Sequence, residues 1–444
     1  MRAWRPALAL IVLVVFAAVA PGAAATSHSQ VLIDSTSIDN AYPRQLVFKL
    51  AAHATAQITG VTLQYTVTGA GPAVQAKPDS FTPGMKISPS VTVEVNSSSS
   101  YIPVGSEFTY HWQVTTADGA SLSSPDQTFV FLPPGPDWKT LSNDFMTVYY
   151  ESGTSDIAAN YLAAAATTYA KMGNLLKTTL AVVPVRTVQF NTEAEAARAR
   201  PAQIAASDPS AASCGAHEGM TVILITPQSC GTAGETDTFR REFTRILVLT
   251  AAGAPNGQAP AWLEEGAAIY SQNTVGGAYA TAFADAARAD TLLPFDTMGT
   301  LPIEPATFAL FEGQSYSMVK YLIDKDSGGF AALFAAIKQR KSFDAALTSA
   351  YGFDLSGFQR AFRVANGLPA ALPSTTAVPT LSPSSPTAQP AAAAAPPPTS
   401  TRSGVGHTTV IIFAVAFVFL VLAVVAYLWM IALQARRPAP PPPD

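Results

Sequence analysis

Two arginines and two glutamates have the types and spacing that bear most directly on chemistry: Arg241, Glu242, Arg245 and Glu265. They lie in the stretch FRREFTRILVLTAAGAPNGQAPAWLEEGAAIY, residues 239–270. On a helix, positions 241 and 245 share one face because they are one turn apart. A zinc hydrolase places two histidines at this spacing, a general-base glutamate beside the first, and a further carboxylate on a second helix. The zinc ion lowers the pKa of its bound water toward about 7, which supplies the nucleophile.

The two arginines limit the chemistry that this stretch can perform. A guanidinium group has no free lone pair and stays protonated in proteins, so neither Arg241 nor Arg245 can ligate zinc. We therefore expect no active catalytic residue, no metal and no other cofactor, and Glu242 has no activated water to deprotonate. We expect instead a salt-bridged cluster of both arginines with Glu242 and Glu265, in which two fixed positive charges replace a divalent ion. The alternative places both arginines on a solvated face.

Strands and helices must position these side chains. The pattern predicts strands at residues 145–150, 186–190 and 220–225, and an alanine-rich helix at 156–176. Helical periodicity dominates from residue 236 onward. The helices expected there are 236–251, 260–272, 278–289, 314–324, 329–340, 342–351 and 355–365. Strands first and helices later is the order of an α+β fold.

With these elements in place, the chain resembles the peptidase MA-like family, gluzincin-type metallopeptidase domains found on bacterial exported proteins. The family pattern is an HExxH helix, a loop and a W-L-x-E-G helix. PAWLEEGAAIY, residues 260–270, matches the second part, with Glu265 at the metal-ligand position. REFTR, residues 241–245, stands at the first part with arginine in place of both histidines, and nineteen residues separate Arg245 from Glu265. The resemblance covers about residues 138–367 and implies a gluzincin-like domain that expects zinc but has lost its ligands.

Two further residues are weaker candidates. His217 begins the string HEGMT, which lacks a second histidine and precedes a strand, so we interpret it as a loop residue. Tyr316 matches a helix that lines the cleft in the family, but a tyrosine at helical spacing is more often a core residue. No nucleophile elbow, P-loop or dinucleotide-binding glycine motif occurs in the sequence.

The N-terminus predicts export. Residues 1–25 have the pattern of a secretory signal, because Arg2 and Arg5 precede an apolar run at 7–20 and small residues offer a cleavage site near Ala25. The alternative is an uncleaved N-terminal anchor. Export would place the chain in an oxidising compartment.

The two cysteines, Cys214 and Cys230, are 16 positions apart. In an oxidising compartment such a pair is expected to form a disulfide, worth about 3 kcal/mol in the chain-entropy model. Two metal thiolates are the alternative, which lacks histidines at zinc spacing other than His217.

The C-terminus predicts a membrane anchor at residues 409–434. The 24 residues from 410 to 433 carry no charge. At about 1.5 Å per residue they span a hydrocarbon core of about 30 Å. Arg436 and Arg437 follow at once and place the tail, residues 435–444, in the cytoplasm. A buried soluble helix is the alternative, but such helices are rarely apolar on every face over this length.

Two regions outside the peptidase-like part complete the organisation. Residues 26–135 show alternating apolar and polar positions broken by turn residues, which predicts a β-sandwich of immunoglobulin or fibronectin type with Trp112 in its core. Residues 368–408 are rich in Pro, Ala, Ser and Thr and predict a disordered, extended stalk.

The expected fold class is multidomain: an all-β immunoglobulin-like sandwich, an α+β gluzincin-like peptidase domain at residues 138–367, a disordered stalk and one transmembrane helix. We expect a single-pass cell-membrane protein whose inactive peptidase-like domain binds or scaffolds outside the cell. The alternatives are an active membrane-anchored hydrolase with an altered site and a stalked adhesin that uses the sandwich. The expected partners are the membrane and an extracellular protein or peptide ligand. A formal net charge of −4 and the lack of a basic stripe give no sign of nucleic acid.

Overall fold

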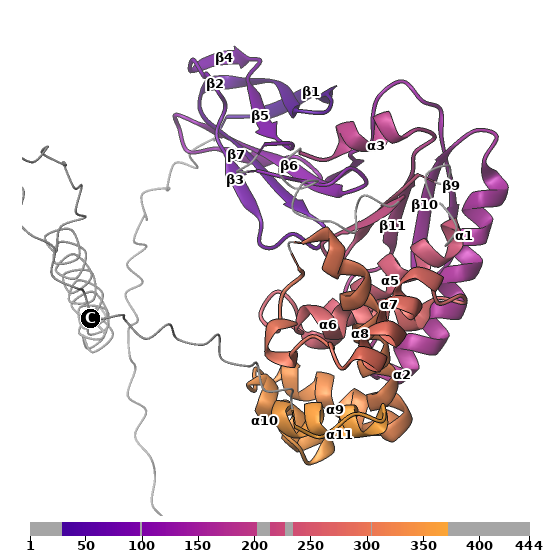
Figure 1. Cartoon of the computed structure of the whole chain (residues 1–444). Helices are drawn as coiled ribbons and strands as arrows, with labels where there is room; N and C mark the ends of the chain where they lie inside the picture. The colour runs from indigo at the N-terminus through magenta and orange to yellow at the C-terminus, as the bar shows by residue number, and fades with distance from the viewer. Residues whose placement is uncertain (1–28, 98–99, 202–213, 227–233, 303, 372–444) are drawn as a thin grey trace, which may run out of the picture. The chain divides into compact units, whose positions relative to one another are not determined.

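The structure of the chain is a computed structural model, and it describes residues 29–97, 100–201, 214–226, 234–302 and 304–371. All of these residues lie within one compact unit, residues 1–374 (Figure 1). The predicted signal peptide, transmembrane helix, cytoplasmic tail and the stalk beyond residue 371 lie outside the described residues. Within the described ranges, no helix has both the length and the apolar character that a bilayer crossing requires.

The N-terminal region is β-rich, as predicted. Eight strands of the described residues form its sheet: β1 (Val31–Ala41), β2 (Gln45–Val67), β3 (Val74–Ala76), β4 (Gly84–Ile87), β5 (Ser90–Glu94), β6 (Glu107–Thr116), β7 (Ser121–Ser123) and β8 (Gln127–Val130). The first half of β2 pairs with β1 and β5, and its second half pairs with β6 and β3. Hydrogen bonds therefore connect these strands into one continuous sheet through β2.

The two halves of β2 face each other across an aromatic core. The ring of Phe48, in the first half, has its centroid 5.0 Å from that of Tyr110 in β6 and 6.3 Å from that of Tyr65 in the second half. Phe48 is fully buried, and so is Trp112 of β6, as the sequence predicted. Along β6, buried side chains alternate with partly exposed ones, the period of a strand with one face on a core.

A second sheet lies in residues 138–225, ahead of most of the helices. Its strands in the described residues are β9 (Trp138–Ser142), β10 (Met146–Glu151), β11 (Val185–Gln189), β12 (Gly215–Glu218) and β13 (Val222–Ile225), in the order β12-β13-β11-β10-β9. Strands β10, β11 and β13 are parallel, whereas β9 and β12 are antiparallel to their neighbours. The three parallel strands match the predicted ones, and the sequence analysis missed β9 and β12.

Both faces of this second sheet are covered. Along β13, Ile223 joins the core formed with the helices, while its neighbour Val222 joins the core of the N-terminal sheet. Burial on both faces is the normal state of parallel strands. An ion pair crosses the contact with the N-terminal sheet, because Nη2 of buried Arg186 lies 2.9 Å from Oε2 of Glu107. The two sheets therefore share a continuous interior.

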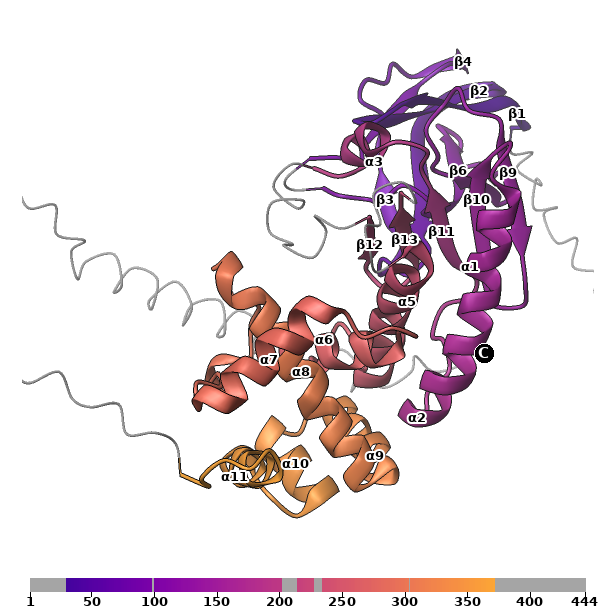
Figure 2. The ribbon, with the colours of Figure 1, turned by 45° about the vertical axis from the view of Figure 1, so that its right-hand side comes forward.

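The helices follow the strands, as the α+β prediction requires. They are α1 (Ser155–Thr168), continued by the π-helical η1 (Tyr169–Gly173) and α2 (Asn174–Leu176); α3 (Glu193–Ala199); α5 (Glu235–Ala252); α6 (Ala261–Ser271); α7 (Gly277–Ala289); the 3₁₀ turn η5 (Phe295–Thr297); α8 (Pro305–Lys325); α9 (Ser327–Lys338); α10 (Phe343–Tyr351); and α11 (Leu355–Ala365). Helices α1 and α5 pack together against the second sheet (Figure 2). Helix α6 packs between α5 and α8.

Candidate functional site

Helix α5 carries three of the four predicted site residues. Its apolar face, which includes Phe239 and Phe243, packs into the core under the second sheet. Arg241, Glu242 and Arg245 lie on the side that meets α6, α8 and β12, where all three side chains form ion pairs. Glu242 and Arg245 are buried. The solvated-face alternative is therefore wrong.

Glu265 of α6 lies between the two arginines. Nη2 of Arg245 lies 2.5 Å from its Oε2, and Nη2 of Arg241 pairs with its Oε1. The Glu265 side chain is only 1% exposed, and that of Arg245 only 6%. Each carboxylate oxygen thus has its own guanidinium partner. The Arg245 contact is also a hydrogen bond, and charge-assisted hydrogen bonds are about twice as strong as neutral ones.

Glu242 joins the same cluster from the other side of Arg245. Its Oε1 lies 3.6 Å from Nε of Arg245. Its Oε2 accepts two hydrogen bonds from His217, one from Nδ1 at 2.9 Å and one from the backbone N–H at 3.1 Å. The hydrogen bonds of Glu242 therefore fasten helix α5 to strand β12.

The interpretation of His217 as a loop residue was wrong. His217 is the third residue of β12 and pairs with Ile223 of β13. The glycine two positions later, Gly219, has φ +60 and makes the turn that joins β12 to β13. The strand is only four residues long, so its alternation was too short to detect. The signal that could have found it is this Gly219 turn directly before a predicted strand.

Two more glutamates belong to the cluster and were missed. Oε1 of Glu312, on α8, accepts a hydrogen bond of 2.7 Å from Nη2 of Arg241. Oε1 of Glu264, on α6, lies at the rim, 3.9 Å from Nη1 of Arg245 and 3.9 Å from Nε2 of His217. We call these seven residues the ionic cluster: His217, Arg241, Glu242, Arg245, Glu264, Glu265 and Glu312.

Burial and the neighbouring charges shift the pKa values of the titratable groups in the ionic cluster. Burial raises the pKa of Glu242, but Arg245 and His217 outweigh burial and bring that pKa down to about 2. Burial lowers the pKa of His217, but the hydrogen bond to Glu242 outweighs it and the pKa is raised. The pKa of Glu312 is raised, because its burial outweighs the attraction of Arg241. The carboxylate of Glu242 is thus held ionised and the imidazole of His217 is biased toward its charged form.

A close helix contact fixes the geometry of the cluster. A Cβ atom at Gly266 of α6 would lie 2.2 Å from the carbonyl oxygen of Ser315 in α8. Only glycine fits at this distance, which explains the glycine that follows the two glutamates of WLEEG. The contact brings α6 against α8 and so places Glu265 and Glu312 around the same arginine, Arg241.

The donor set does not fit a zinc ion. A gluzincin site uses neutral imidazoles and carboxylates, whereas both oxygens of Glu265 face guanidinium groups, which cannot ligate a metal. Nδ1 of His217 is engaged by Glu242. Across the described parts of the chain, no group of three or more His, Cys, Asp or Glu side chains is placed to hold a metal ion.

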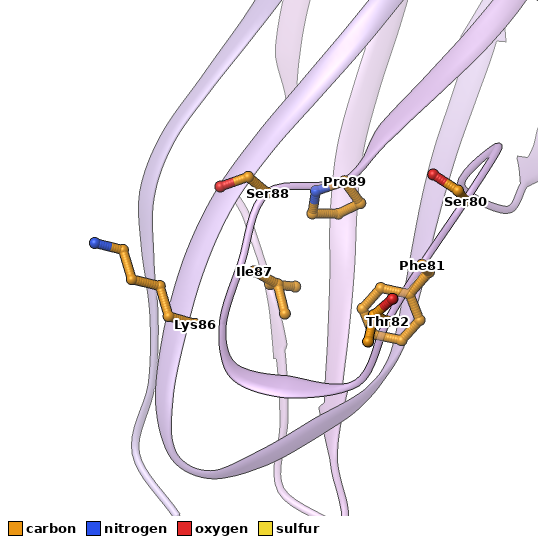
Figure 3. A pocket seen from close by; sticks show the side chains of 7 residues that line it. All are labelled: Ser80, Phe81, Thr82, Lys86, Ile87, Ser88 and Pro89. Atoms are coloured by element: carbon orange, nitrogen blue, oxygen red, sulfur yellow. The ribbon is translucent and has the colours of Figure 1, made fainter.

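The remaining predicted residues lie apart from this chemistry. Cys214 is buried next to β12, while Cys230 lies outside the described residues, so the disulfide stays a prediction. Tyr316 of α8 packs its ring 6.5 Å from that of Tyr270. A pocket of about 300 Å³ lies in the N-terminal sheet and does not involve the cluster (Figure 3). Its lining residues are Ser80, Phe81, Thr82, Lys86, Ile87, Ser88 and Pro89.

Comparison with known proteins gives one family match, and it lies in the helical part. Residues 205–366 match the model of the Peptidase MA superfamily, a range that contains the whole ionic cluster. This match supports a peptidase MA-like domain, and hence a peptidase-related protein. No curated protein matches the chain. The solved "Crystal structure of Br derivative BhCBM56" is similar over 21% of this chain and 88% of its own, at 12% identity and a TM-score of 0.17, which is too low to support any argument.

Proposed function

We propose that this chain is a membrane-anchored extracellular protein whose peptidase MA-like domain has lost its zinc site and acts as a surface binding or scaffolding module. The observation that carries the proposal is the double contact of Glu265 with Arg241 and Arg245. Glu265 occupies the metal-ligand position of the resemblance, and the two arginines occupy the histidine positions. The residues at the three expected ligand positions form ion pairs with one another instead.

Charge explains why such a domain keeps its fold. Two guanidinium groups supply the same charge as a divalent ion and neutralise part of the buried carboxylate charge around them. They also join α5 to α6, the two helices that would carry the metal ligands, and Arg241 adds a contact to α8. Hydrolysis has no corresponding replacement, because a guanidinium cannot lower the pKa of a bound water as zinc does.

The location and partners follow from the sequence outside the described residues. The uncharged run at 410–433 and the N-terminal signal pattern support a single span with the body outside the cell. A ligand of such a body is an extracellular protein or peptide.

Metal analysis of the purified full-length chain tests the proposal. We expect zinc far below one equivalent per chain and no effect of a chelator on melting temperature. Stoichiometric zinc, or peptide cleavage that a chelator abolishes, would overturn the proposal. A digestion panel of generic peptides should be run on the same sample.

A metal-free hydrolase is the second candidate, and the hydrogen bond between His217 and Glu242 is the observation that favours it. A buried carboxylate that orients a histidine is an arrangement used by general bases. Chelator-resistant cleavage that His217→Gln abolishes would select this candidate. Absence of cleavage in the wild-type chain supports the binding module.

A further inference from the structure

A pocket of about 200 Å³ lies where the N-terminal sheet, the segment before β9 and the second sheet meet. No residue of the ionic cluster lines it. Its walls combine aromatic rings and prolines with two carboxylates and one guanidinium: Tyr42, Pro133, Pro134, Pro136, Trp138, Glu151, Phe190, Glu195 and Arg198.

The aromatic walls are held in place by their own contacts. The indole Nε1–H of Trp138 donates to the carbonyl oxygen of Pro133 at 2.9 Å. The Trp138 and Phe190 rings meet edge to face, with centroids 6.4 Å apart and an interplanar angle of 86°. Tyr42 packs against Phe131 at a centroid distance of 6.0 Å. The rings are therefore preorganised and need little ordering when a ligand binds.

The first carboxylate of the pocket, Glu151, ends strand β10. Glu151 is opposite Trp138 in the β9–β10 register, so the carboxylate and the indole start from neighbouring backbone positions. Its Oε2 accepts a hydrogen bond of 2.8 Å from the amide of Asn191. This donor is a neutral amide and brings no positive charge to Glu151.

The second carboxylate, Glu195, is fixed by the capping box of helix α3. Its Oε2 accepts from the backbone N–H of Thr192 at 3.0 Å, while Thr192 Oγ1 accepts from the backbone N–H of Glu195 at 3.2 Å. Within the described residues, neither Glu151 nor Glu195 has a cationic side chain in ion-pair distance. Both glutamates are thus held by neutral donors at the edge of an aromatic pocket.

The balance of charge in the pocket is negative. Glu151 and Glu195 line the same pocket, and burial together with the charge of Glu195 raises the pKa of Glu151. Arg198, an exposed residue of α3, offsets one of the two negative charges. A cation that enters the pocket gains from the carboxylates and from aromatic rings in its walls, whereas a neutral molecule of the same shape gains only contact area.

We propose that this pocket binds the ammonium group of a small organic cation, either a quaternary ammonium or the primary ammonium of a lysine side chain. Aromatic faces together with carboxylates are the groups that recognise such cations. Pockets for drug-sized ligands measure about 300–1,000 Å³, so a smaller one suits a single cationic group. The proposal is independent of the function assigned to the ionic cluster.

Calorimetric titration of the full-length chain with three probes tests the proposal. The probes are choline, Nα-acetyl-lysine methylamide, and the neutral isostere of choline in which a tert-butyl group replaces the trimethylammonium. We expect saturable binding of at least one cation, and binding of the neutral isostere weaker than that of choline by about tenfold or more if choline is the one that binds. The stronger of the two cations identifies the ligand class as quaternary or primary ammonium.

Variants locate the binding in this pocket. Glu151→Gln and Glu195→Gln keep the shape of each side chain and should weaken cation binding by about tenfold. Glu193→Gln changes an exposed glutamate of the same helix that does not line the pocket, and it should bind as the wild type does. Arg198→Ala removes a like charge and should tighten binding. The proposal is overturned if neither cation binds, if the isostere binds as well as choline, or if Glu193→Gln loses as much affinity as Glu151→Gln.

Discussion

Arg245 of α5 and Glu265 of α6 meet at 2.5 Å in a part of the domain from which water is almost excluded. Arg241 places a second guanidinium group on the same carboxylate and also forms an ion pair with Glu312 of α8. Three helices are therefore joined through ion pairs between these side chains. A buried charge without its partner is costly, whereas a complete set is tolerated.

Removing Arg245 should destabilise the domain strongly. Arg245→Ala leaves one oxygen of Glu265 without its cation and deprives Glu242 of its arginine. We expect the free energy of unfolding to fall by about 3–5 kcal/mol, the cost of breaking a buried pair. Urea denaturation followed by tryptophan fluorescence measures this change.

The matched control for this experiment is Arg288→Ala on helix α7. The Arg288 side chain is 79% exposed and pairs with Asp285 three residues earlier. Exposed pairs contribute about 0–1 kcal/mol, so the control should be nearly as stable as the wild type. Equal losses in the two variants would show that the ionic cluster is not a buried structural unit.

Restoring the two histidines should create a zinc site. Arg241→His combined with Arg245→His places two imidazoles one helical turn apart, facing Glu265. We expect zinc to raise the melting temperature of this double variant in a concentration-dependent way, because a ligand that binds only the folded state stabilises it. The wild-type chain should show no such rise. A double variant that folds but ignores zinc would contradict the assignment of positions 241 and 245 as former ligand positions.

His217 should make stability depend on pH. The folded pKa of His217 is raised, so its contribution is complete below its ordinary value of about 6.5 and is lost as pH rises through the raised value. The folded pKa of Glu242 is lowered to about 2, so its contribution is present above the ordinary 4.5 and is lost as pH falls toward about 2. The pair therefore stabilises the fold most between about pH 5 and 6.5.

Melting temperatures of wild type and His217→Gln across this range test the pH dependence. The difference between them should be largest near about pH 5–6 and shrink at alkaline pH. His111→Gln is the control, since Asp126, the partner of His111, is 68% exposed and the pair should contribute little. A difference that grows with pH would contradict the prediction.

Gly266 should tolerate no side chain. The Cβ of Gly266→Ala would meet a backbone oxygen of α8 at 2.2 Å, so a helix must move. We expect a loss of about 1–3 kcal/mol, the usual cost of overpacking, measured as a lower melting temperature. Gly277→Ala, at the start of α7, meets nothing within 4 Å and should be neutral or slightly stabilising. Two variants of equal stability would contradict the close packing of α6 on α8.

The sequence predicted the parts of the ionic cluster that depend on local spacing. Arg241 and Arg245 lie one turn apart on a helix with clear periodicity, and the WLEEG helix places Glu265 near them. Glu312 was missed because the start of α8 was set at residue 314, after Pro305 and Gly313. Pro305 is tolerated in the first turn, where its missing N–H costs nothing, and Gly313 is required because a Cβ would lie 2.1 Å from the carbonyl oxygen of Tyr279. Proline and glycine normally mark the end of a helix, but here both lie inside α8. The contact that requires Gly313 involves a residue distant in the sequence, so no local pattern reveals it.

Strand β2 shows the same limit in the N-terminal sheet. The sequence pattern favoured two strands here, residues 45–54 and 58–67, and Gly60 lies inside the second. In the structure β2 continues through a bulge between Ile58 and Gly60. A Cβ at Gly60 would lie 2.3 Å from Oγ1 of Thr115, so the glycine permits close contact with β6. Alternation predicts a strand, but it does not show which turn signals are bulges.

The shared interior of the two sheets has a practical consequence for dissecting this chain. Val188 and Leu224 of the second sheet are covered by the N-terminal strands. Truncating the protein near residue 135, at the domain boundary expected from the sequence, would remove these strands and expose apolar side chains of the second sheet to water. The C-terminal fragment should self-associate or precipitate. The N-terminal sheet expressed alone would lack the second sheet that covers part of its core. Surface point changes, rather than deletions, are the sound way to ask which portion recognises a partner.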